Sequence, residues 1–573
     1  MKIKLFTLSL LLFLCGLKAE SPNIILMITD DQGYGDFGAT GNHIVKTPHI
    51  DAMAGRSFEM TRFYVNAVCS PTRASLLTGR SSYRTGVTDT WKGRSTMRAE
   101  EFTLAEMLKT KGYATGLFGK WHLGDNYPCR PVDQGFDESL YHLGGGLSQP
   151  ADPLENGRRY TDPVLYKNGK KHPVKGYCCD VYYEEAIRWF SENNKQGKPF
   201  FAYIATNTPH GPFHDVPEKW YNFYKDQDLG KGNFDQDKGH KIAGKDDNDR
   251  TARIYAMISN IDENVGKVFD ALDRLKITKD TIVIYMSDNG PDGYRYVSGF
   301  KGKKSMSTEG GLRSPIWFHW PQKFKAGGKS DLVSAHFDIM PTIAEITEAK
   351  FPEGKTIDGK SLLPALRGEN QRWSDRTFVL QSHRGTRPER LINSAIISQD
   401  WKIETDLKGN MALFDMKNDP FATKNLEDQK PEIKNKMISF YDSWLKSLEG
   451  EYPDMWSPLP VKVDTAFESP CFLTRQEMRI ADNLPWHMQK TNGEWHLEIV
   501  KSGEYEISFQ LLEGAAKVKA ELVINGKLIE SKEFNSLKVM KFGKAKLNSG
   551  KAVLKIKVNA DGKDAGPWHA FIK

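Results

Sequence analysis

Residues 23 to 31 of the chain are Asn23-Ile24-Ile25-Leu26-Met27-Ile28-Thr29-Asp30-Asp31. A nearly continuous apolar run of this kind is typical of a strand buried on both faces, as in a parallel sheet. The carboxylates that end the run are costly to bury unless a cation pairs with them. We expect a central parallel strand that delivers Asp30 and Asp31 to a charged site, although one Asp-Asp pair alone would favour a solvated turn.

Later apolar stretches also end in polar groups. They are Ala114 to Phe118 before Gly119-Lys120-Trp121-His122, Pro199 to Thr206 before Thr208-Pro209-His210, and Thr281 to Met286 before Ser287-Asp288-Asn289-Gly290. Helical signals lie between them, namely a capping box from Thr103 to Glu106 and a long helical stretch from about Asp249 to Leu275. This alternation predicts a largely parallel sheet covered on both faces, with its site at the carboxyl ends of the strands.

Oxygen ligands gather at two of these strand ends. The residues are Asp30, Asp31, Asp288 and Asn289. Carboxylate and amide oxygens suit a hard cation, calcium or magnesium, rather than zinc. The cysteines also lack the CxxC spacing that is typical of zinc sites.

A second informative stretch is Val68-Cys69-Ser70-Pro71-Thr72-Arg73-Ala74-Ser75-Leu76-Leu77-Thr78-Gly79-Arg80. We expect a loop that turns into a helix, with Ser70 as the N-cap and Pro71 at the first helical position. Cys69 would then lie at the positive end of the helix dipole, and Arg73 would add a forked cation. This pattern favours a site for a sulfuryl or phosphoryl group. The alternative is a buried structural cysteine beside a surface arginine.

Cys69-x-Pro71-x-Arg73, followed by Ala74 to Arg80, resembles the signature of the formylglycine-dependent sulfatases. The resemblance implies an α/β fold of the alkaline-phosphatase type, with a mixed, largely parallel sheet flanked by helices. It implies that a separate maturation enzyme oxidises Cys69 to formylglycine, whose hydrated aldehyde is the nucleophile. It also implies a calcium ion with the ligands Asp30, Asp31, Asp288 and Asn289.

Further motifs match the same family. Gly119-Lys120-Trp121-His122 and Thr208-Pro209-His210 supply a lysine and two histidines. The stretch from Phe300 to Lys304, which leads to Glu309-Gly310-Gly311, resembles the lysine segment of the family. Counting back five residues from Glu309 selects Lys304 as the matching lysine, with Lys301 and Lys303 as alternatives.

The resemblance implies a role for each of these residues. One hydroxyl of the hydrated formylglycine attacks sulfur, while the metal, Arg73, Lys120 and Lys304 stabilise negative charge. His210 helps to protonate the leaving alcohol, and His122 helps to expel sulfate afterwards. For any one of these cations taken alone, a solvated surface charge is the alternative.

The chain has 573 residues, which exceeds one ordinary hydrophobic core, so several domains are expected. We assign residues 1–19 to a signal peptide, 20–375 to the catalytic α/β domain, 376–455 to its smaller C-terminal subdomain and 456–573 to an appended β module. In the subdomain, Leu413 to Leu426 resembles the end of sulfatase domains, and a helix is expected from about Pro431 to Leu448. In the module, apolar and polar residues alternate around the hairpin signal Asn525-Gly526. Its tryptophans either stack on sugar rings or belong to its core: Trp486, Trp495 and Trp568.

The first residues indicate export. Lys2 and Lys4 precede an apolar run from Leu5 to Leu17, which is typical of a secretory signal and short for a membrane span. A lipid anchor at Cys15 is the alternative, although the large residues before it do not favour one. We expect a periplasmic or extracellular protein with no membrane partner after signal removal. An oxidising compartment allows a disulfide among Cys129, Cys178, Cys179 and Cys471.

The expected function is that of an exported sulfatase that acts on a sulfated carbohydrate, with a galactose or N-acetylgalactosamine type favoured. The formal net charge of +7, part of which leaves with the signal, is too small to favour nucleic acid or a membrane surface as partner. The alternatives are a phosphomonoester or phosphonate hydrolase of the same superfamily, a hydrolase of choline sulfate or a small aryl sulfate, and a non-catalytic glycan-binding protein. The loops from Tyr141 to Gly146 and from Gln149 to Tyr166 are expected to border the pocket.

Overall fold

The computed structural model describes residues 21–147, 149–234, 238–369, 376–457, 459–535 and 537–573. The signal peptide predicted for residues 1–19 lies outside these ranges. Within them, none of the helices has the length and the apolar character that crossing a bilayer requires.

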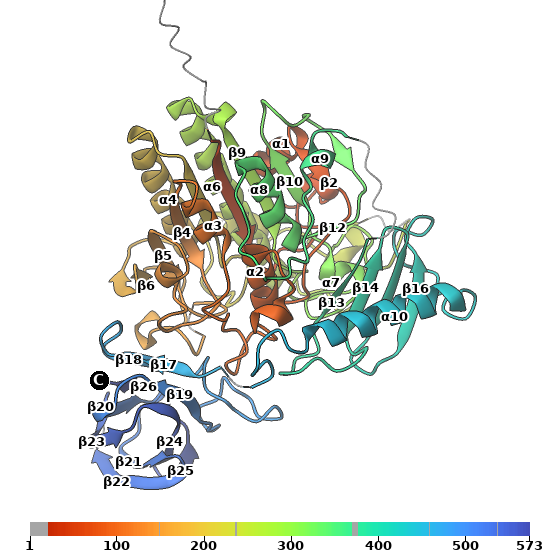
Figure 1. Ribbon diagram of the computed structural model, residues 1–573. Helices are drawn as coiled ribbons and strands as arrows, with labels where there is room; N and C mark the ends of the chain where they lie inside the picture. The colour runs from red at the N-terminus through yellow and green to blue at the C-terminus, as the bar shows by residue number, and fades with distance from the viewer. Residues whose placement is uncertain (1–20, 148, 235–237, 370–375, 458, 536) are drawn as a thin grey trace, which may run out of the picture.

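A ten-stranded sheet forms the centre of the molecule, with the strand order β11-β2-β10-β9-β1-β8-β4-β5-β6-β7 (Figure 1). Its middle strands are parallel: β1 (Asn23–Thr29), β4 (Ala114–Lys120), β5 (Glu138–His142), β8 (Phe200–Ala205) and β9 (Thr281–Ser287). The outer strands are β2 (Phe58–Met60), β6 (Val164–Lys167), β7 (Lys170–Pro173), β10 (Ile316–His319) and β11 (Lys329–Ser330). Because β10 and β6 pair antiparallel with the parallel core, the sheet is mixed and largely parallel, as predicted.

Helices cover both faces of this sheet, and the side chains of β1 alternate between two hydrophobic cores. Ile24, Leu26 and Ile28 face one core, whereas Ile25 and Met27 face the other. The first core includes α2 (Cys69–Thr78), α3 (Leu104–Lys109), α8 (Ile339–Thr347) and α9 (Leu363–Leu366). The second includes α1 (Pro48–Gly55), α4 (Cys178–Lys195) and α6 (Asn248–Leu275). The nearly continuous apolar run of β1 follows from this burial on both sides.

Smaller elements complete this part of the chain. The short strands β3 (Phe63–Tyr64) and β12 (Ser334–Ala335) pair with each other, and the short helices are α5 (Glu218–Tyr224) and α7 (Glu309–Leu312). The capping box at Thr103 and Glu106 is confirmed, and α6 closely matches the predicted long helix.

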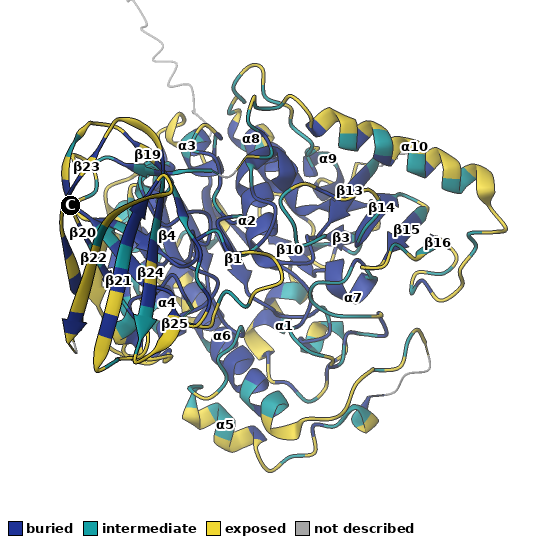
Figure 2. Cartoon of the chain, turned by 90° about the horizontal axis from the view of Figure 1, so that it is seen from below, coloured by how far each residue is buried: buried dark blue, intermediate teal, exposed yellow. Residues whose placement is uncertain are grey.

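A second, antiparallel sheet lies beside the first. It consists of β13 (Thr377–Gln381), β14 (Ser394–Ser398), β15 (Trp401–Thr405) and β16 (Met411–Asp415). Helix α10 (Pro431–Leu448) packs on it through Met437, Tyr441 and Trp444, with its opposite face exposed (Figure 2). The predicted helix from Pro431 to Leu448 is therefore confirmed.

The last part of the chain folds into two β-sheets around one core, and we refer to residues 461–572 as the C-terminal β module (Figure 1). One sheet contains β17 (Val461–Val463), β19 (Trp495–Ile499), β21 (Lys517–Ile524), β22 (Lys527–Asn535), β24 (Gly550–Ala560) and β25 (Lys563–Ala565). The other contains β18 (Cys471–Thr474), β20 (Gly503–Gln510), β23 (Met540–Leu547) and β26 (His569–Ile572). Asn525 and Gly526 both have positive φ between β21 and β22, which confirms the hairpin.

The tryptophans of the module do not form an exposed sugar platform. Trp495 is fully buried and Trp568 is 4% exposed, so both belong to the core. Trp486 is half-buried, and its ring lies 5.8 Å from that of Trp91 in the catalytic part of the chain. The five cysteines in the described ranges are all free thiols.

Candidate active site

The register of the central sheet brings the polar strand ends together. Thr29 of β1 is paired with Ser287 of β9, so Asp30 and Asp288 leave adjacent strands at the same level. On the other side of β1, β8 and β4 lead to His210 and Lys120. All the residues singled out from the sequence lie in one connected cluster: Asp30, Asp31, Cys69, Arg73, Lys120, His122, His210, Asp288, Asn289 and Lys304.

The start of α2 differs from the prediction. The helix begins at Cys69 with Val68 as its N-cap, so Ser70 is not the cap and Pro71 is the third helical residue. The hydrogen bonds that hold this turn come from the Thr72 hydroxyl. It accepts the Asn66 N–H at 3.0 Å and donates to the Asp288 carbonyl at 2.7 Å. Cys69 therefore still lies in the first turn, and Thr72 ties that turn to the end of β9.

Three buried ion pairs organise the charges. Arg73 Nη2 lies 2.9 Å from Asp288 Oδ2, and Lys120 Nζ lies 2.6 Å from Asp30 Oδ2, with all four side chains 0% exposed. Lys304 Nζ lies 2.6 Å from Asp31 Oδ1. Removing one partner of a buried pair typically costs roughly 3–5 kcal/mol, because it leaves an uncompensated charge.

The three lysines between Phe300 and Lys304 have different surroundings. Lys304 reaches Asp31, whereas the side chain of Lys301 is exposed. Lys303 lies over the ring of Tyr294, with Nζ 5.6 Å from the ring centroid. Glu309, the residue from which Lys304 was counted, instead binds Lys402 at 2.9 Å inside the protein.

The acidic residues have an arrangement that fits a hard cation. Asp30 Oδ1 and Asn289 Oδ1 are buried and have no hydrogen-bond partner among the described residues. Asn289 donates its amide to Asp31 Oδ1 at 2.8 Å, which leaves its oxygen free to act as a ligand. Burial and the charge of Asp30 raise the pKa of Asp288 to about 7, although Arg73 and Lys120 oppose this rise. An oxygen donor set with unpartnered atoms is typical of calcium or magnesium sites.

His122 is held as a neutral base that faces residue 69. Its Nε2 lies 2.9 Å from the Thr90 carbonyl oxygen, so Nε2 carries the proton and donates it to that acceptor. Its Nδ1 is then an acceptor, 3.5 Å from Cys69 Sγ. Burial, helped by the charge of Lys120, lowers the pKa of His122 well below its ordinary value. The ring is therefore uncharged at neutral pH.

His210 has the opposite orientation of its ring nitrogens. Its Nδ1 donates to the Gly211 carbonyl at 2.7 Å, and its Nε2 lies 3.7 Å from Asp31 Oδ2. Burial and the charge of Lys304 lower the pKa of His210 to about 4, although Asp31 acts in the other direction. Its side chain is 14% exposed, so Nε2 is positioned to exchange a proton with a bound ligand.

Cys69 is buried within the cluster and is 2% exposed. Burial raises the pKa of its thiol, although Lys120 and Lys304 oppose this, so an unmodified Cys69 is a neutral thiol. The predicted loop from Tyr141 to Gly146 contacts both histidines of the cluster through its glycines. A Cβ atom added to Gly145 would lie 3.0 Å from His122 Cε1, and one added to Gly146 would lie 3.1 Å from His210 Nδ1.

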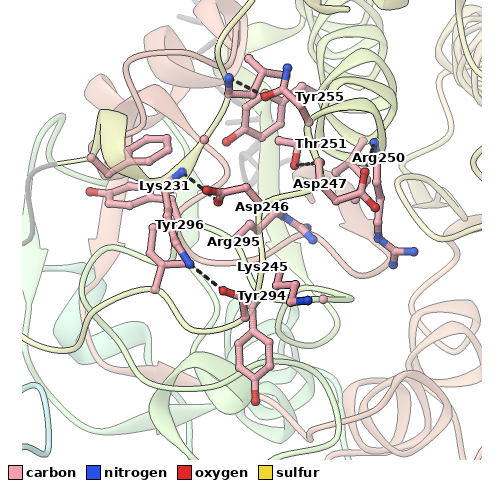
Figure 3. Close-up of a pocket in the computed structure, with 18 of the residues that line it drawn as sticks. Lys231, Lys245, Asp246, Asp247, Arg250, Thr251, Tyr255, Tyr294, Arg295 and Tyr296 are labelled. Atoms are coloured by element: carbon pink, nitrogen blue, oxygen red, sulfur yellow. Dashed lines mark hydrogen bonds between the residues drawn. The ribbon is translucent and has the colours of Figure 1, made fainter.

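A pocket of about 240 Å³ is lined by none of the cluster residues, but one of its lining residues, Arg295, donates to the Asp31 carbonyl oxygen at 2.8 Å (Figure 3). Arg250 also lines this pocket. Its Nη2 lies 2.9 Å from Asp292, and its guanidinium stacks on Phe213, in the loop that follows His210. Tyr294 lines this pocket with 40% of its side chain exposed, and Lys245 lies near it in Figure 3. An exposed aromatic ring beside cations is a suitable surface for an anionic sugar.

Sequence motifs did not reveal every residue of the site. Thr90 and Gln476 both contact the His122 ring, yet they are 386 residues apart and neither belongs to a recognisable motif. Thr72 lies inside the signature at one of its variable positions. Only the folded chain identifies these contacts.

Comparisons with known proteins agree with this geometry. The sulfatase family model matches residues 22–349, and the model for the C-terminal region of N-sulphoglucosamine sulphohydrolase matches residues 298–443. N-acetylgalactosamine-6-sulfatase of Mus musculus is 30% identical over 391 residues, covering 63% of this chain and 69% of that protein. Arylsulfatase A of Homo sapiens is 30% identical over 392 residues, covering 64% of this chain and 71% of that protein.

A solved structure extends the likeness to the fold. The crystal structure of Ps i-CgsB in complex with k-i-k-neocarrahexaose is 26% identical, has a TM-score of 0.65, and covers 75% of this chain and 94% of that chain. The predicted α/β fold of the alkaline-phosphatase type, with a smaller subdomain and a C-terminal β-rich part, is confirmed. Since the first family model spans more than half of the chain, the chain belongs to the sulfatase family and is a sulfuric ester hydrolase.

Proposed function

We propose that this protein is an exported sulfatase that hydrolyses a sulfate ester on a saccharide, with residue 69 converted to formylglycine. The main support is the placement of Cys69 within one cluster that contains three buried or nearly buried cations and three carboxylates. A neutral buried thiol is a poor nucleophile, which favours conversion of Cys69 by a formylglycine-generating maturation enzyme.

In this proposal, a hydroxyl of hydrated residue 69 gives its proton to the Asp288 carboxylate, which lies within 4.8 Å of the position of Sγ, as its oxygen attacks the sulfur atom and the bond between sulfur and the sugar oxygen breaks. In the neutral His210 ring the proton is on Nδ1, so Nε2 takes up a second proton when the anionic ester binds and passes it to the departing alcohol. His122 Nδ1 then takes the proton from the other hydroxyl of residue 69. The electron pair released re-forms the carbonyl group while the C–O bond to sulfate breaks. Arg73, Lys120 and Lys304 stabilise the negative charge of the sulfuryl oxygens throughout.

Asp30, Asp31, Asp288 and Asn289 would hold a calcium ion. A bound calcium ion would supply positive charge to the ester oxygens and offset the crowded carboxylates. The unpartnered oxygens of Asp30 and Asn289 support this assignment.

We assign the pocket beside Tyr294 to a further sugar of the saccharide, because an exposed aromatic ring and cations line it and Arg295 links it to the Asp31 carbonyl. The likeness to an N-acetylgalactosamine-6-sulfatase favours a galactose or N-acetylgalactosamine sulfate. We propose residues 20–375 as the catalytic domain, 376–455 as its subdomain and 456–573 as an accessory module, with export to the periplasm or beyond directed by residues 1–19.

The decisive experiment measures sulfate release by protein co-expressed with a maturation enzyme. The panel contains galactose, N-acetylgalactosamine and glucosamine sulfates that differ in sulfate position, together with an aryl sulfate and an aryl phosphate. We expect release from one sugar ester, and loss of this release in the Cys69→Ala variant. Release of phosphate alone, or no release from any ester when mass spectrometry shows residue 69 converted, would contradict the proposal.

A further inference from the structure

We infer that Gln476 of the C-terminal β module is a positioning residue for His122, so that the module completes the active site. The inference rests on the proposed function, in which Nδ1 of His122 is the base at residue 69. It goes beyond that function because the sequence-predicted site residues all lie between Asp30 and Lys304, whereas Gln476 follows β18.

The contact runs through the carbonyl oxygen of Thr90. This oxygen accepts the Nε2–H of His122 at 2.9 Å and the side-chain amide of Gln476 at 2.7 Å. The same amide nitrogen lies 2.8 Å from Ser95 Oγ and 3.4 Å from His122 Nε2. Gln476 is 1% exposed, so bulk water does not compete for these contacts. The group that fixes the tautomer of His122 is thus held by a side chain of the module.

The backbone around Gln476 docks tightly on the loop that carries Thr90. The Gly93 N–H donates to the Gln476 carbonyl at 2.7 Å, and Arg479 Nη1 donates to the Lys92 carbonyl at 2.9 Å. Gly93 has φ +68°, and a Cβ atom there would lie 2.8 Å from Arg479 Cζ. A side chain at this position would be strained by the positive φ and would displace the Arg479 guanidinium.

The segment that carries Gln476 is itself tied to the core of the module. Trp495, which is fully buried, donates its indole N–H to the Thr474 carbonyl at 2.7 Å. Arg475, also buried, donates to the Pro567 carbonyl at 2.9 Å. The backbone that carries Gln476 is therefore fixed to the core of the module. The position of Gln476 relative to His122 depends on the folded module.

The consequence concerns the second half of the proposed reaction. While the Thr90 carbonyl stays in place, Nε2 of His122 keeps its proton and the lone pair of Nδ1 points toward residue 69. Without the Gln476 amide, this buried carbonyl loses a donor, and the loop that carries it is no longer fixed against the module. The base would then be poorly oriented, whereas attack on sulfur and departure of the alcohol would not depend on Gln476.

The test compares Gln476→Leu, which removes the amide at similar volume, with Gln510→Leu on β20 of the same module. Gln476→Met serves as a second variant because it keeps the length of the side chain and removes the donor to Thr90. In full-length matured protein, we expect both Gln476 variants to lower kcat for an aryl sulfate about 10- to 100-fold with KM nearly unchanged. Rapid mixing should show a fast burst of phenol followed by slow turnover, because only the later step is impaired.

A second measurement does not depend on activity. Histidine ring nitrogens are isotopically labelled in protein that retains the Cys69 thiol, and the His122 signals are assigned with a His122→Gln variant. Nuclear magnetic resonance should show the Nε2–H tautomer in the wild type and in Gln510→Leu, and a mixture of tautomers in Gln476→Leu. An inactive wild type would refute the proposed function and leave this measurement to decide the inference. An active wild type whose Gln476 variants match Gln510→Leu in burst, kcat and tautomer would overturn the inference.

Discussion

Replacement of His210 by alanine should slow hydrolysis of a sugar sulfate far more than hydrolysis of an aryl sulfate. The Gly211 carbonyl accepts the Nδ1–H at 2.7 Å, so Nε2, which lies 3.7 Å from Asp31, is the nitrogen that can take up a proton and pass it to a leaving group. A sugar alkoxide is a poor leaving group and needs this proton, whereas nitrophenolate leaves without it. General acid catalysis contributes about 10²- to 10⁴-fold, or roughly 3–5 kcal/mol of transition-state stabilisation. We expect a loss of this size in kcat/KM for the sugar ester and only a few-fold loss for nitrophenyl sulfate.

The assay measures sulfate release from both esters by the same preparations of matured protein. His214→Ala is the matched control, because His214 lies in the same loop with an exposed side chain. The control should retain wild-type rates on both esters. Equal losses on the two esters in His210→Ala would refute the leaving-group role and would point to a general disturbance of the site.

The remaining predictions concern charge, substrate length and pH. Lys304→Met should abolish detectable sulfate release, because Asp31 would lose its buried partner, whereas Lys303→Met should leave aryl sulfate hydrolysis near the wild-type rate. Tyr294→Ala should raise KM for a sulfated oligosaccharide several-fold and leave KM for an aryl sulfate unchanged, since the ring lines only the neighbouring pocket. Burial lowers the pKa of His336 to about 3 from 6.5, so on acidification the unfolded chain binds this proton first and stability falls between these values. In urea unfolding, His336→Gln should reduce this loss by up to about 1.4 kcal/mol per pH unit, and an unchanged slope would contradict the reasoning.

Local chemistry made several features predictable from the sequence. The apolar run from Asn23 to Thr29 indicated a doubly buried strand because both of its faces contact cores. The capping box at Thr103 and Glu106 depends on residues only three apart, so local sequence was enough to predict it. The prediction of Ser70 as the N-cap was wrong because a contact distant in the sequence sets this turn. The turn before α2 is organised by Thr72, whose hydroxyl reaches the Asp288 carbonyl 216 residues away.

The sequence by itself determined which side chains carry the chemistry, because each lies in a short motif at the end of a strand or at the start of a helix. The tertiary structure decided how they are paired. The register between β1 and β9 places Asp30 beside Asp288, and the fold selects Lys304 over Lys303 as the partner of Asp31. The tautomer of His122 depends on the Thr90 carbonyl, which Gln476 reaches from the far end of the chain. A hydrogen bond between residues 386 apart leaves no periodicity or spacing in a sequence, so only the packing of the module against the catalytic core could reveal it.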